Sequence, residues 1–488
     1  MSVTFPTEYV ANVTLTVVRA AGWGRAALVK GRRRCEHVFV SVYVELHCHS
    51  AYSFLDGASL PDELAATAHE LGYAALALTD HDGLHGAMEL ADATSHDGPL
   101  AGLRPIVGAE LTLEDGSHLT LLCATRTGYS NLCRLVTKAH AGTRPHPGRD
   151  PLAPVTAYAD LERHAAGLIC LSGCARHGAV ARAVEEGRHA DAVAAARRLL
   201  TIFGADDLRI ELQRPFARHD RRRNRLLAEL AGRLGVACVA TGNVHAHRRE
   251  RAALQDALVA VRNRRTLDEC EALRRGNSSH ALASPDEMAA RFADHPDAVA
   301  ETVRVAERIE LDLRSDLGYR YPREDDPDAD SELAAVCRAR LHERYPSCVA
   351  RAEAEVRLDE ELRVIRHLDL SGFFLLHREM LELARTVAIE VRGPDTVRAL
   401  LPPGRGSSVS SLVCYLTGLS HVDPVEKGLN LGRFLNDDLS AMPDIDLDFP
   451  RDIRERLIPR VHDRWGHDRS ALVASFPTYQ APSAVRDF

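Results

Sequence analysis

The sequence of 488 residues lacks any continuous apolar run of about 18 residues, the length that a bilayer-spanning helix needs. Its first 42 residues do not form a secretory signal peptide, because basic residues interrupt them and no apolar core leads to a small-residue cleavage site. The 11 cysteines contain no CxxC pair and lack the dense spacing of a disulfide-rich secreted domain. These absences together predict a cytoplasmic protein with no membrane partner.

A positive charge excess is also lacking, since the formal net charge is −8. Proteins that bind nucleic acid usually carry a basic patch, so the charge is a weak argument against such a partner. Clustered carboxylates that hold metal ions also lower the net charge, and therefore a nucleic-acid enzyme is not excluded. The length suggests two to four domains, and 45% hydrophobic residues are enough to fill their cores.

Short apolar segments alternate with amphipathic helical stretches from residue 42 to about residue 245. This alternation is typical of βαβ units and predicts an α/β fold with a parallel sheet, in which seven strands can close into a barrel. Between the first two strands, Ser59 is expected to cap a helix that Gly72 ends. The candidate strands are Val42–Leu46, Ala74–Thr79, Ile106–Leu111, Leu119–Leu122, Gly167–Leu171, Leu208–Leu212 and Val236–Ala240.

The second half of the chain has a different pattern. Residues 247 to 390 are mostly helical in character, with charged faces such as Arg351–Arg366, and the stretch Arg314–Asp330 reads as a surface loop. From Leu400 a glycine-rich and serine-rich stretch, a short apolar helix and an acidic segment follow one another. Residues 1–42 fit neither half, and one interpretation is a translation start placed too far upstream.

Residue types that bind metals gather at the ends of the candidate strands. Because the carboxyl ends of parallel barrel strands meet at one mouth, side chains far apart in the sequence are expected to converge there. Imidazole nitrogens combined with carboxylate oxygens suit zinc, manganese or iron rather than calcium. Coincidence among 24 histidines is a poor explanation for this regular placement. The residues concerned are His47, His49, Asp56, Asp80, His81, Glu110, His118, Cys174, Asn243 and His245.

A second constellation lies near the C-terminal end of the sequence. The loop Pro403-Gly-Arg-Gly-Ser-Ser408 precedes the apolar run Val409–Leu419, and its backbone N–H groups, hydroxyls and helix N-terminus suit a phosphate, with Arg405 as a pairing cation. In a strand, the three aspartates of Asp444-Ile-Asp-Leu-Asp448 project to one face, where a magnesium ion would relieve their repulsion. An ordinary solvated edge strand is the alternative interpretation.

The motifs of the first constellation resemble the PHP (polymerase and histidinol phosphatase) domain. They are Tyr43-Val-Glu-Leu-His-Cys-His-Ser-Ala-Tyr-Ser-Phe-Leu-Asp-Gly57, Leu78-Thr-Asp-His-Asp-Gly83 and Ile106-Val-Gly-Ala-Glu110, with Gly128-Tyr-Ser-Asn-Leu-Cys-Arg-Leu135 similar to the version found in bacterial polymerase III alpha subunits. The resemblance implies a distorted (β/α)7 barrel with up to three metal ions, Zn²⁺ or Mn²⁺ here. The metal ligands that it implies are His47, His49, Asp56, His81, Glu110, His118, Cys174 and His245.

One departure from the family motif concerns Asn243, where active PHP domains usually carry aspartate. An amide is a weaker, uncharged ligand, so one metal position and full hydrolytic activity are in question. Two interpretations of the barrel therefore stay open: a metal-dependent phosphoesterase or 3′–5′ exonuclease, and a structural barrel that its metals hold together.

The second constellation resembles the palm of C-family bacterial DNA polymerases, which has a polymerase-beta-like nucleotidyltransferase fold. The matching segments include Gly404-Arg-Gly-Ser-Ser408, Arg433-Phe-Leu-Asn436 and Met442-Pro-Asp-Ile-Asp-Leu-Asp-Phe449. The resemblance implies Asp446 and Asp448 as catalytic Mg²⁺ ligands, Asp444 as a flanking residue, and Arg405, Gly406, Ser407 and Ser408 as the substrate-binding loop. The segment Gly418-Leu-Ser-His-Val-Asp423 is most similar to the error-prone, damage-induced branch of these polymerases.

These similarities predict four segments: an extension at residues 1–42, a PHP domain at 43–285, a partial palm at 286–450 and the start of a thumb at 451–488. The family places its third catalytic aspartate further along the chain, so we expect these 488 residues not to extend a primer alone. The resemblance implies DNA primer-template and deoxynucleoside triphosphates as substrates. It also implies a sliding clamp and accessory mutagenesis proteins as partners of the full-length protein.

Overall fold

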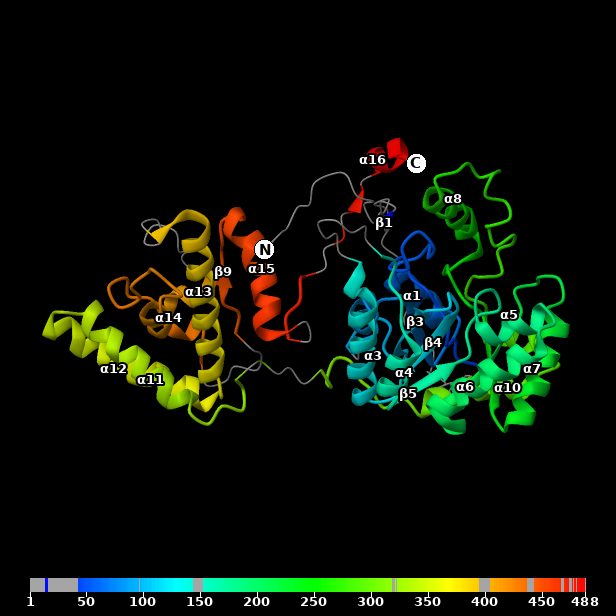
Figure 1. Cartoon of the computed structure of the whole chain (residues 1–488), viewed down its shortest axis with the longest axis horizontal. Coiled ribbons are helices and arrows are strands. Elements are labelled where there is room, and N and C mark those ends of the chain that lie inside the picture. Colours follow the sequence, from blue (N-terminus) through cyan, green and yellow to red (C-terminus); the bar gives the residue numbers. More distant parts are fainter. Residues whose placement is uncertain are drawn as a thin grey trace, which may run out of the picture. The chain divides into compact units, whose positions relative to one another are not determined.

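The computed structural model describes residues 14–15, 43–95, 97–143, 152–317, 321, 323–394, 404–436, 443–466, 469–473, 476, 478–479 and 481–487 (Figure 1). The chain divides into two compact units. The barrel unit comprises Pro6–Leu317 and Ser475–Phe488, and the helical unit comprises Met1–Phe5 and Gly318–Ala474. The predicted extension at residues 1–42 lies outside the described residues except for the two-residue strand β1 (Thr14–Leu15), which pairs with β10 (Thr478–Tyr479).

The barrel unit alternates strands with helices, as the sequence predicts. Its strands are β2 (Ala75–His81), β3 (Arg104–Thr112), β4 (His118–Cys123), β5 (Leu168–Leu171), β6 (Leu208–Gln213) and β7 (Ala237–Thr241). Its helices are α1 (Pro61–Glu70), α2 (Ala87–Ala93), α3 (Arg126–Ala139), α4 (Tyr158–His164), α5 (Ala179–Glu185), α6 (His189–Asp207), α7 (Asp220–Leu234), α8 (Ala252–Asn263), α9 (Pro285–Arg291), α10 (Pro296–Glu307) and α16 (Ala481–Asp487).

The sheet is mixed, and the prediction of a purely parallel sheet is wrong. Its six strands follow sequence order from β2 to β7, but β4 runs antiparallel to both β3 and β5. The tight connection Leu113–Ser117 explains the reversal, because a parallel return needs a crossover of a dozen or more residues. The reversal also places His118, at the start of β4, opposite Thr112 at the end of β3. His118 therefore reaches the same edge as the carboxyl ends of the parallel strands.

The first predicted strand is present as an extended segment rather than as a ladder strand. Glu45 bridges Leu76 of β2, and Cys48 bridges Val244 just after β7, both in parallel. The N–H of His49 donates to the Val244 carbonyl at 2.7 Å, and the N–H of Val244 donates to the His47 carbonyl at 2.9 Å. This segment therefore joins the two edges of the sheet and brings His47 and His49 to the place where they meet.

Each strand buries an apolar stretch before it reaches the polar edge. Ile106 lies in the core while Glu110, four residues later and on the same strand face, reaches the cluster of histidines described below. Val305 and Ala306 of helix α10, and Ile309 just after it, also pack in this core. Because α10 packs on the sheet, the barrel unit extends to Leu317.

The start of α1 differs from the prediction. The residue before the helix is Leu60, and its N–H donates to the Glu63 carboxylate at 3.0 Å. Ser59 does not cap the helix, since its hydroxyl contacts His247 Nδ1 at 2.8 Å and accepts from the His247 N–H at 2.9 Å. Gly72 follows the end of the helix with a φ of 80°, a conformation that favours glycine.

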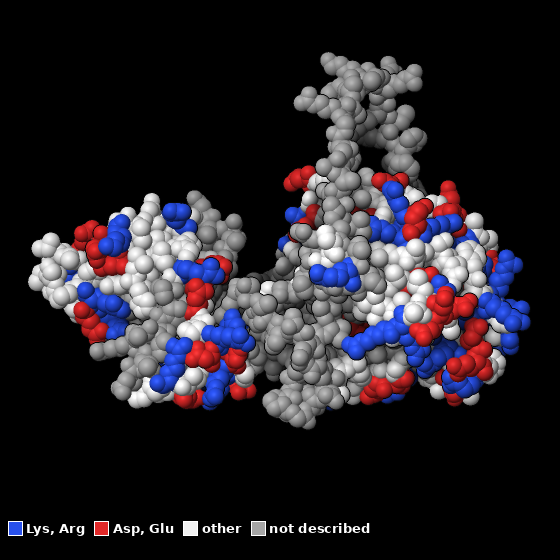
Figure 2. Space-filling model, turned by 90° about the horizontal axis from the view of Figure 1, so that it is seen from above, with Lys and Arg blue, Asp and Glu red and all other residues white. Residues whose placement is uncertain are grey.

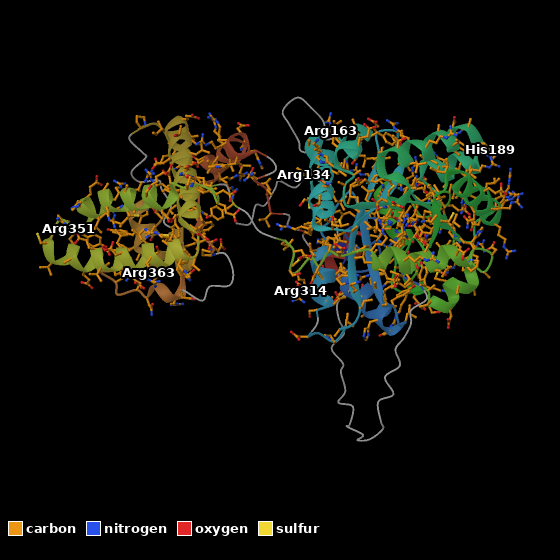
Figure 3. All side chains as sticks on the ribbon, turned by 90° about the horizontal axis from the view of Figure 1, so that it is seen from below. Arg134, Arg163, His189, Arg314, Arg351 and Arg363 are labelled. Carbon is orange, nitrogen blue, oxygen red and sulfur yellow. The ribbon has the colours of Figure 1, made fainter. Side chains whose placement is uncertain are left out.

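The helical unit contains the elements α11 (Ala329–Arg344), α12 (Cys348–His367), α13 (Ser371–Arg392), β8 (Gly404–Arg405), α14 (Leu412–Thr417), β9 (Asp446–Leu447) and α15 (Arg451–Trp465). Apolar residues from Tyr321 to Ile445 form one core, and α13 packs against α15 through a second cluster. The charged face predicted at Arg351–Arg366 lies on α12, where Figure 3 labels Arg351 and Arg363 on the outside of the helix.

Charges of both signs are mixed on the surface drawn in Figure 2, without a broad field of one sign over the coloured residues. Among the described residues, no helix combines the length and the apolar character needed to cross a bilayer.

Candidate functional sites

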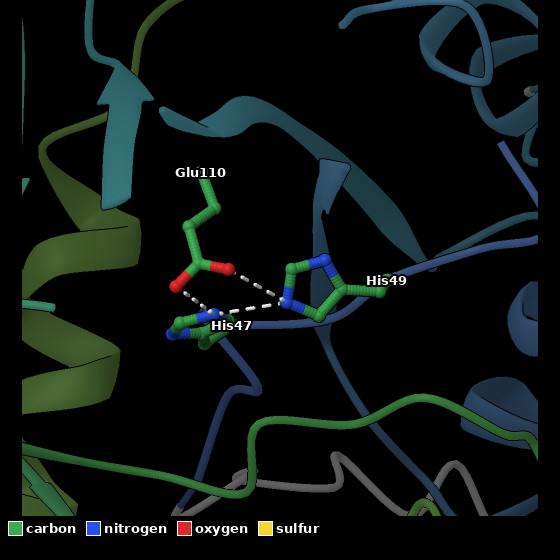
Figure 4. A group of neighbouring side chains, drawn as sticks. All are labelled: His47, His49 and Glu110. Carbon is green, nitrogen blue, oxygen red and sulfur yellow. Dashed lines mark hydrogen bonds and ion pairs between the residues drawn. The ribbon is translucent and has the colours of Figure 1, made fainter. Parts of the chain in front are cut away.

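Three of the predicted metal ligands meet at the edge of the barrel sheet (Figure 4). The Nε2 atoms of His47 and His49 lie 3.0 Å apart, and the two carboxylate oxygens of Glu110 lie 3.5 and 3.6 Å from them. His47 and His49 come from the segment that joins the sheet edges, whereas Glu110 comes from β3. All three residues are buried, with exposed fractions of 0–1%.

Hydrogen bonds on the outer nitrogens orient the two rings. His47 Nδ1 donates to Glu211 Oε1 at 2.7 Å. Ser53 donates its only proton to Asp80 at 2.7 Å, so His49 Nδ1 must donate to Ser53 Oγ at 3.2 Å. The facing Nε2 atoms lie beside the Glu110 carboxylate, and this arrangement requires a positive charge between them, either a proton on His47 Nε2 or a metal ion in its place.

The electrostatics of the site agree with this requirement. Burial alone lowers the pKa of His47, but the carboxylates of Glu211 and Glu110 outweigh burial and raise the pKa to about 10. Burial also opposes ionisation of Glu110, yet His81 and His47 hold its pKa well below the usual range. The mouth of the barrel is therefore a place where a cation is stabilised.

A second group shares Glu110 and adds His81 and His118. His81 Nδ1 lies 3.0 Å and His118 Nδ1 lies 3.5 Å from Glu110 Oε2. Among the described residues, Glu110 Oε1 and His118 Nδ1 are buried and have no hydrogen-bond partner. Buried polar atoms are nearly always hydrogen-bonded, so these two atoms fit the role of metal ligands. The mixed set of nitrogen and oxygen ligands suits zinc or manganese.

Two further predicted ligands, Asp56 and His245, lie beside this group but contact an arginine. Arg275 Nη2 donates to both oxygens of Asp56 at 3.1 Å and lies 3.2 Å from His245 Nδ1. Asp56 also contacts His81 Nε2 at 3.2 Å, and His245 Nε2 contacts Asn243 Oδ1 at 2.9 Å. The His245 ring stacks on His49 with the ring centroids 4.4 Å apart.

Cys174, like Asp56 and His245, lies outside both groups of three. Its buried sulfur accepts from the N–H of His177 at 3.3 Å. Burial, and then the nearby charge of Glu110, raises the pKa of the thiol well above its usual value. The thiol is therefore protonated unless a metal ion is bound to it, since a bound metal deprotonates a coordinating thiol.

The loop that carries Asp56 has a defined local cause. Asp80 accepts from the Ser50 N–H at 2.6 Å, the Ser50 hydroxyl at 2.8 Å and the Ser53 hydroxyl, and these bonds fold the segment after His49 into a tight turn. Gly57 follows, where an added Cβ would lie 1.8 Å from the Ser50 carbonyl oxygen. Only glycine allows this close approach, which places Asp56 beside His81.

Three residues that support the site are missing from the predicted set. Glu211 orients His47, Arg275 pairs with Asp56, and Glu45 accepts from the N–H groups of His47 and Gly242 at 3.0 and 2.9 Å. A sequence signal exists for both glutamates: each is a charged residue inside an apolar strand, on the face that its alternation shares with polar neighbours. Arg275 lies in a loop without periodicity and carries no such signal.

In the helical unit, β8 pairs antiparallel with β9, and Arg405 lies opposite Asp446. Ile445 is buried and Leu447 packs against the core, while Asp444 and Asp448 are exposed and Asp446 is half-buried. The alternation predicted for this acidic segment is therefore present. The glycine-serine loop and the acidic strand, about 40 residues apart in the sequence, are adjacent in the fold.

Arg405 contacts the carboxylates rather than open solvent. Its Nε lies 3.1 Å from Asp448 Oδ2, and its Nη2 lies 3.8 Å from Asp446 Oδ1. All three side chains are exposed by 39–56%, so this is a surface ion pair of small net energy. Gly406 follows with a φ of 75°, and an added Cβ would lie 3.5 Å from Asp446 Oδ2.

The serine side of the loop is less open than the sequence suggests. Ser407 is exposed, but Ser408 is buried and its hydroxyl donates to the Arg405 carbonyl at 3.0 Å. The N-terminus of α14 is not open to a phosphate, in contrast to the prediction. Its first N–H groups, those of Leu412 and Val413, donate to the buried Glu361 at 2.8 and 3.0 Å. The accessible part of the loop is Arg405–Ser407.

Comparisons with known proteins match both units of the chain. Residues 45–215 match the family model described as the PHP domain, and residues 331–488 match that of the bacterial DNA polymerase III alpha NTPase domain. An amidohydrolase from Chromobacterium violaceum, a solved structure, aligns at 20% identity over 42% of this chain and 87% of its own, with a TM-score of 0.29. A score this low supports no argument about the fold.

Two relatives of high similarity are error-prone DNA polymerases. The protein from Symbiobacterium thermophilum is 37% identical over 460 residues, and that from Cutibacterium acnes is 39% identical over 458 residues. Each alignment covers 91% of this chain but only 40% and 38% of the relatives, so the chain spans about two fifths of their length. The chain therefore contains a PHP domain and a bacterial DNA polymerase III alpha NTPase domain, and over 91% of its length it is similar to error-prone DNA polymerases.

Proposed function

We propose that this chain is the N-terminal part of an error-prone, DNA-directed DNA polymerase of the bacterial cytoplasm, which adds deoxynucleotides in translesion synthesis and DNA repair. The observation that carries the proposal is the pairing of β8 with β9. It sets a glycine-serine loop against two aspartates, which is the combination that nucleotidyl transfer needs. The substrates are a DNA primer-template and deoxynucleoside triphosphates.

In this proposal Asp446 and Asp448 hold Mg²⁺, which neutralises the charge on the triphosphate and on the attacking 3′-hydroxyl when it is bound. The exposed backbone of Gly406 and Ser407 receives phosphate oxygens. Arg405 now pairs with Asp448, and it exchanges that carboxylate for a phosphate oxygen when the metal and the nucleotide arrive. The buried Glu361 accepts from Ser411 and from the Leu412 N–H, and so anchors the segment that directly follows the loop.

The test is metal-dependent nucleotide binding by the purified chain. Fluorescence anisotropy of a labelled deoxynucleoside triphosphate in the presence of Mn²⁺ would measure affinity for the chain and for D446N, D448N and D444N. We expect D446N and D448N to weaken binding at least tenfold, while D444N, on the same strand but flanking, changes it less than threefold. Equal losses in all three variants, or nucleotide binding that needs no metal, would contradict the assignment.

A second function is supported by the barrel mouth. Two metal-binding groups that share Glu110, with unsatisfied donor atoms on Glu110 and His118, favour a metal-dependent phosphoesterase or 3′–5′ exonuclease that uses Zn²⁺ or Mn²⁺. Such ions activate water and polarise a phosphate when bound. His47, His49, His81 and His118 hold them, and Glu211 fixes the tautomer of His47.

End-labelled DNA incubated with the chain and Mn²⁺ distinguishes an enzyme from a structural barrel. Shortening of the strand that disappears in H47A and H49A, with the melting temperature of the barrel unit little changed, indicates hydrolysis at this mouth. An unchanged strand, together with a large loss of stability in the same variants, indicates that the metals are structural.

A further inference from the structure

The predicted ligands Asp56 and His245 form a corner of the barrel mouth in which every side-chain oxygen and ring nitrogen already has a polar partner. Both Asp56 oxygens accept from Arg275 at 3.1 Å, and one of them also contacts His81. His245 uses both ring nitrogens: Nδ1 accepts from Arg275 at 3.2 Å, and Nε2 donates to Asn243 Oδ1 at 2.9 Å. A metal ion would have to displace at least one of these contacts.

The opposite corner of the mouth differs in this respect. Glu110 Oε1 and His118 Nδ1 are buried and have no hydrogen-bond partner among the described residues. The facing Nε2 atoms of His47 and His49 contact only each other and Glu110 among the described residues, so a metal ion can replace the proton between them. The atoms of the mouth that are available as metal ligands are thus concentrated around Glu110. The two groups of three that can hold an ion both contain this residue.

Arg275 is held in the mouth by its own segment. Its neighbour Arg274 pairs with Asp256 at 3.4 Å, and Arg176 donates to the Leu273 carbonyl at 3.1 Å on the preceding turn. After Arg275, the side chains of Asn277 and Ser279 both donate to the Pro215 carbonyl, at 2.8 and 2.9 Å. The guanidinium is therefore part of the built site, with only 12% of its side chain exposed.

The charges of the corner fit an arginine in place of an ion. Asn243 provides an amide where PHP domains usually have a carboxylate, so Asp56 is the one carboxylate of the predicted ligands there. One guanidinium neutralises one carboxylate, whereas a divalent ion would leave an uncompensated charge in a buried place. The φ of Asn243 is 47°, a left-handed conformation that asparagine tolerates and that aims its amide at His245.

We propose that Arg275 takes the place of a metal ion between Asp56 and His245, so that the mouth binds two divalent ions, both on Glu110, and not three. The inference rests on the proposed metal site. It predicts that the capacity for a third ion is restored when the guanidinium is removed.

The experiment counts Mn²⁺ ions bound at equilibrium by electron paramagnetic resonance, in a chain that also carries D446N and D448N to remove the palm carboxylates. The variants are R275Q, the control R265Q at an exposed arginine nearby in the sequence, and E110Q. We expect two ions in the parent chain, three in R275Q, two in R265Q and at most one weak ion in E110Q. Circular dichroism would check that each variant is folded.

Three ions in the parent chain would overturn the inference, because Arg275 would then yield to a metal. Two ions in R275Q would also overturn it, since something other than the guanidinium would limit the number. A parent chain that binds no ion, with E110Q unchanged, would instead refute the metal site itself. The failure of the inference and the failure of the proposed metal site are thus separate results.

Discussion

The two carboxylate sites of this chain differ most in burial. In the barrel mouth, the side chains of His47 and Glu110 are exposed by 0% and 2%, whereas those of Asp446 and Asp448 on β9 are exposed by 39% and 56%. The mouth is supported by buried hydrogen bonds to Glu211, Asp80 and Ser53. The palm aspartates contact one exposed arginine.

This difference predicts different metal behaviour. A buried set of oriented nitrogens and oxygens binds an ion by itself, because the ligands are already positioned. Exposed aspartates bind Mg²⁺ weakly, since the ion keeps its waters and shares its remaining ligands with substrate phosphates. In the proposed function, the mouth is therefore a preformed metal centre, and β9 is half of a site that the nucleotide would complete.

The largest expected effect is on the stability of the helical unit, which depends on a buried carboxylate near the exposed aspartates. Glu361 is fully buried and accepts from Ser411, Leu412, Val413 and Arg357. The substitution E361A leaves these donors unpaired, and we expect a loss of about 3 kcal/mol in the free energy of unfolding of the helical unit. Calorimetry with hydrogen exchange on α14 measures it. The control E360Q removes an exposed pair with Arg363, and an equal loss there would contradict this reading.

The second prediction concerns the residue that both metal groups share. E110Q should weaken Mn²⁺ binding by the barrel unit more than a hundredfold, because a neutral amide replaces the one carboxylate common to both groups. A Mn²⁺ titration measures the effect, with the exposed Glu162 changed to Gln as the control. Binding within threefold of the parent would place the metal elsewhere.

A smaller effect is expected from the residue that orients His47. E211Q keeps the size of the side chain but weakens the acceptor that fixes the proton on His47 Nδ1. We expect a loss of about 10-fold to 100-fold in metal affinity, the range that outer-shell substitutions produce. The same titration checks it, and a loss as large as that of E110Q would mean that Glu211 is itself a ligand.

The smallest effect on stability is expected at the surface of the palm. R405A should change the free energy of unfolding by less than about 1 kcal/mol, because exposed ion pairs contribute little. Nucleotide affinity should nevertheless fall about tenfold if Arg405 contacts the triphosphate. Urea unfolding and anisotropy measure the two quantities, and unchanged nucleotide affinity would remove Arg405 from the proposed loop.

The sequence predicts the strands and the mouth well because both follow from local pattern. Alternating apolar segments mark β2 to β7, and polar residues at their ends mark the edge where they meet. The reversal of β4 is not predicted, since strand direction depends on the length of the connection and on pairing with distant strands. The sequence nevertheless places His118 at the mouth, because it leads into the fourth candidate strand and also matches the family motif.

The remaining differences arise from long-range contacts. Arg275 reaches Asp56 from 219 residues away in the sequence, and no periodicity announces that contact. Glu361 on α12 accepts from the N–H groups at the N-terminus of α14, and these groups are then not available to a phosphate. Both are charged residues buried against a specific partner, which only the folded chain reveals.

The most direct test of the contrast is one titration of the purified chain with Mn²⁺, followed by electron paramagnetic resonance with and without a deoxynucleoside triphosphate. We predict tight binding without nucleotide that E110Q abolishes and D446N leaves intact, and additional binding with nucleotide that D446N abolishes and E110Q leaves intact. Nucleotide-independent binding that survives in E110Q, or that D446N removes, would contradict the account of a preformed mouth and an incomplete palm.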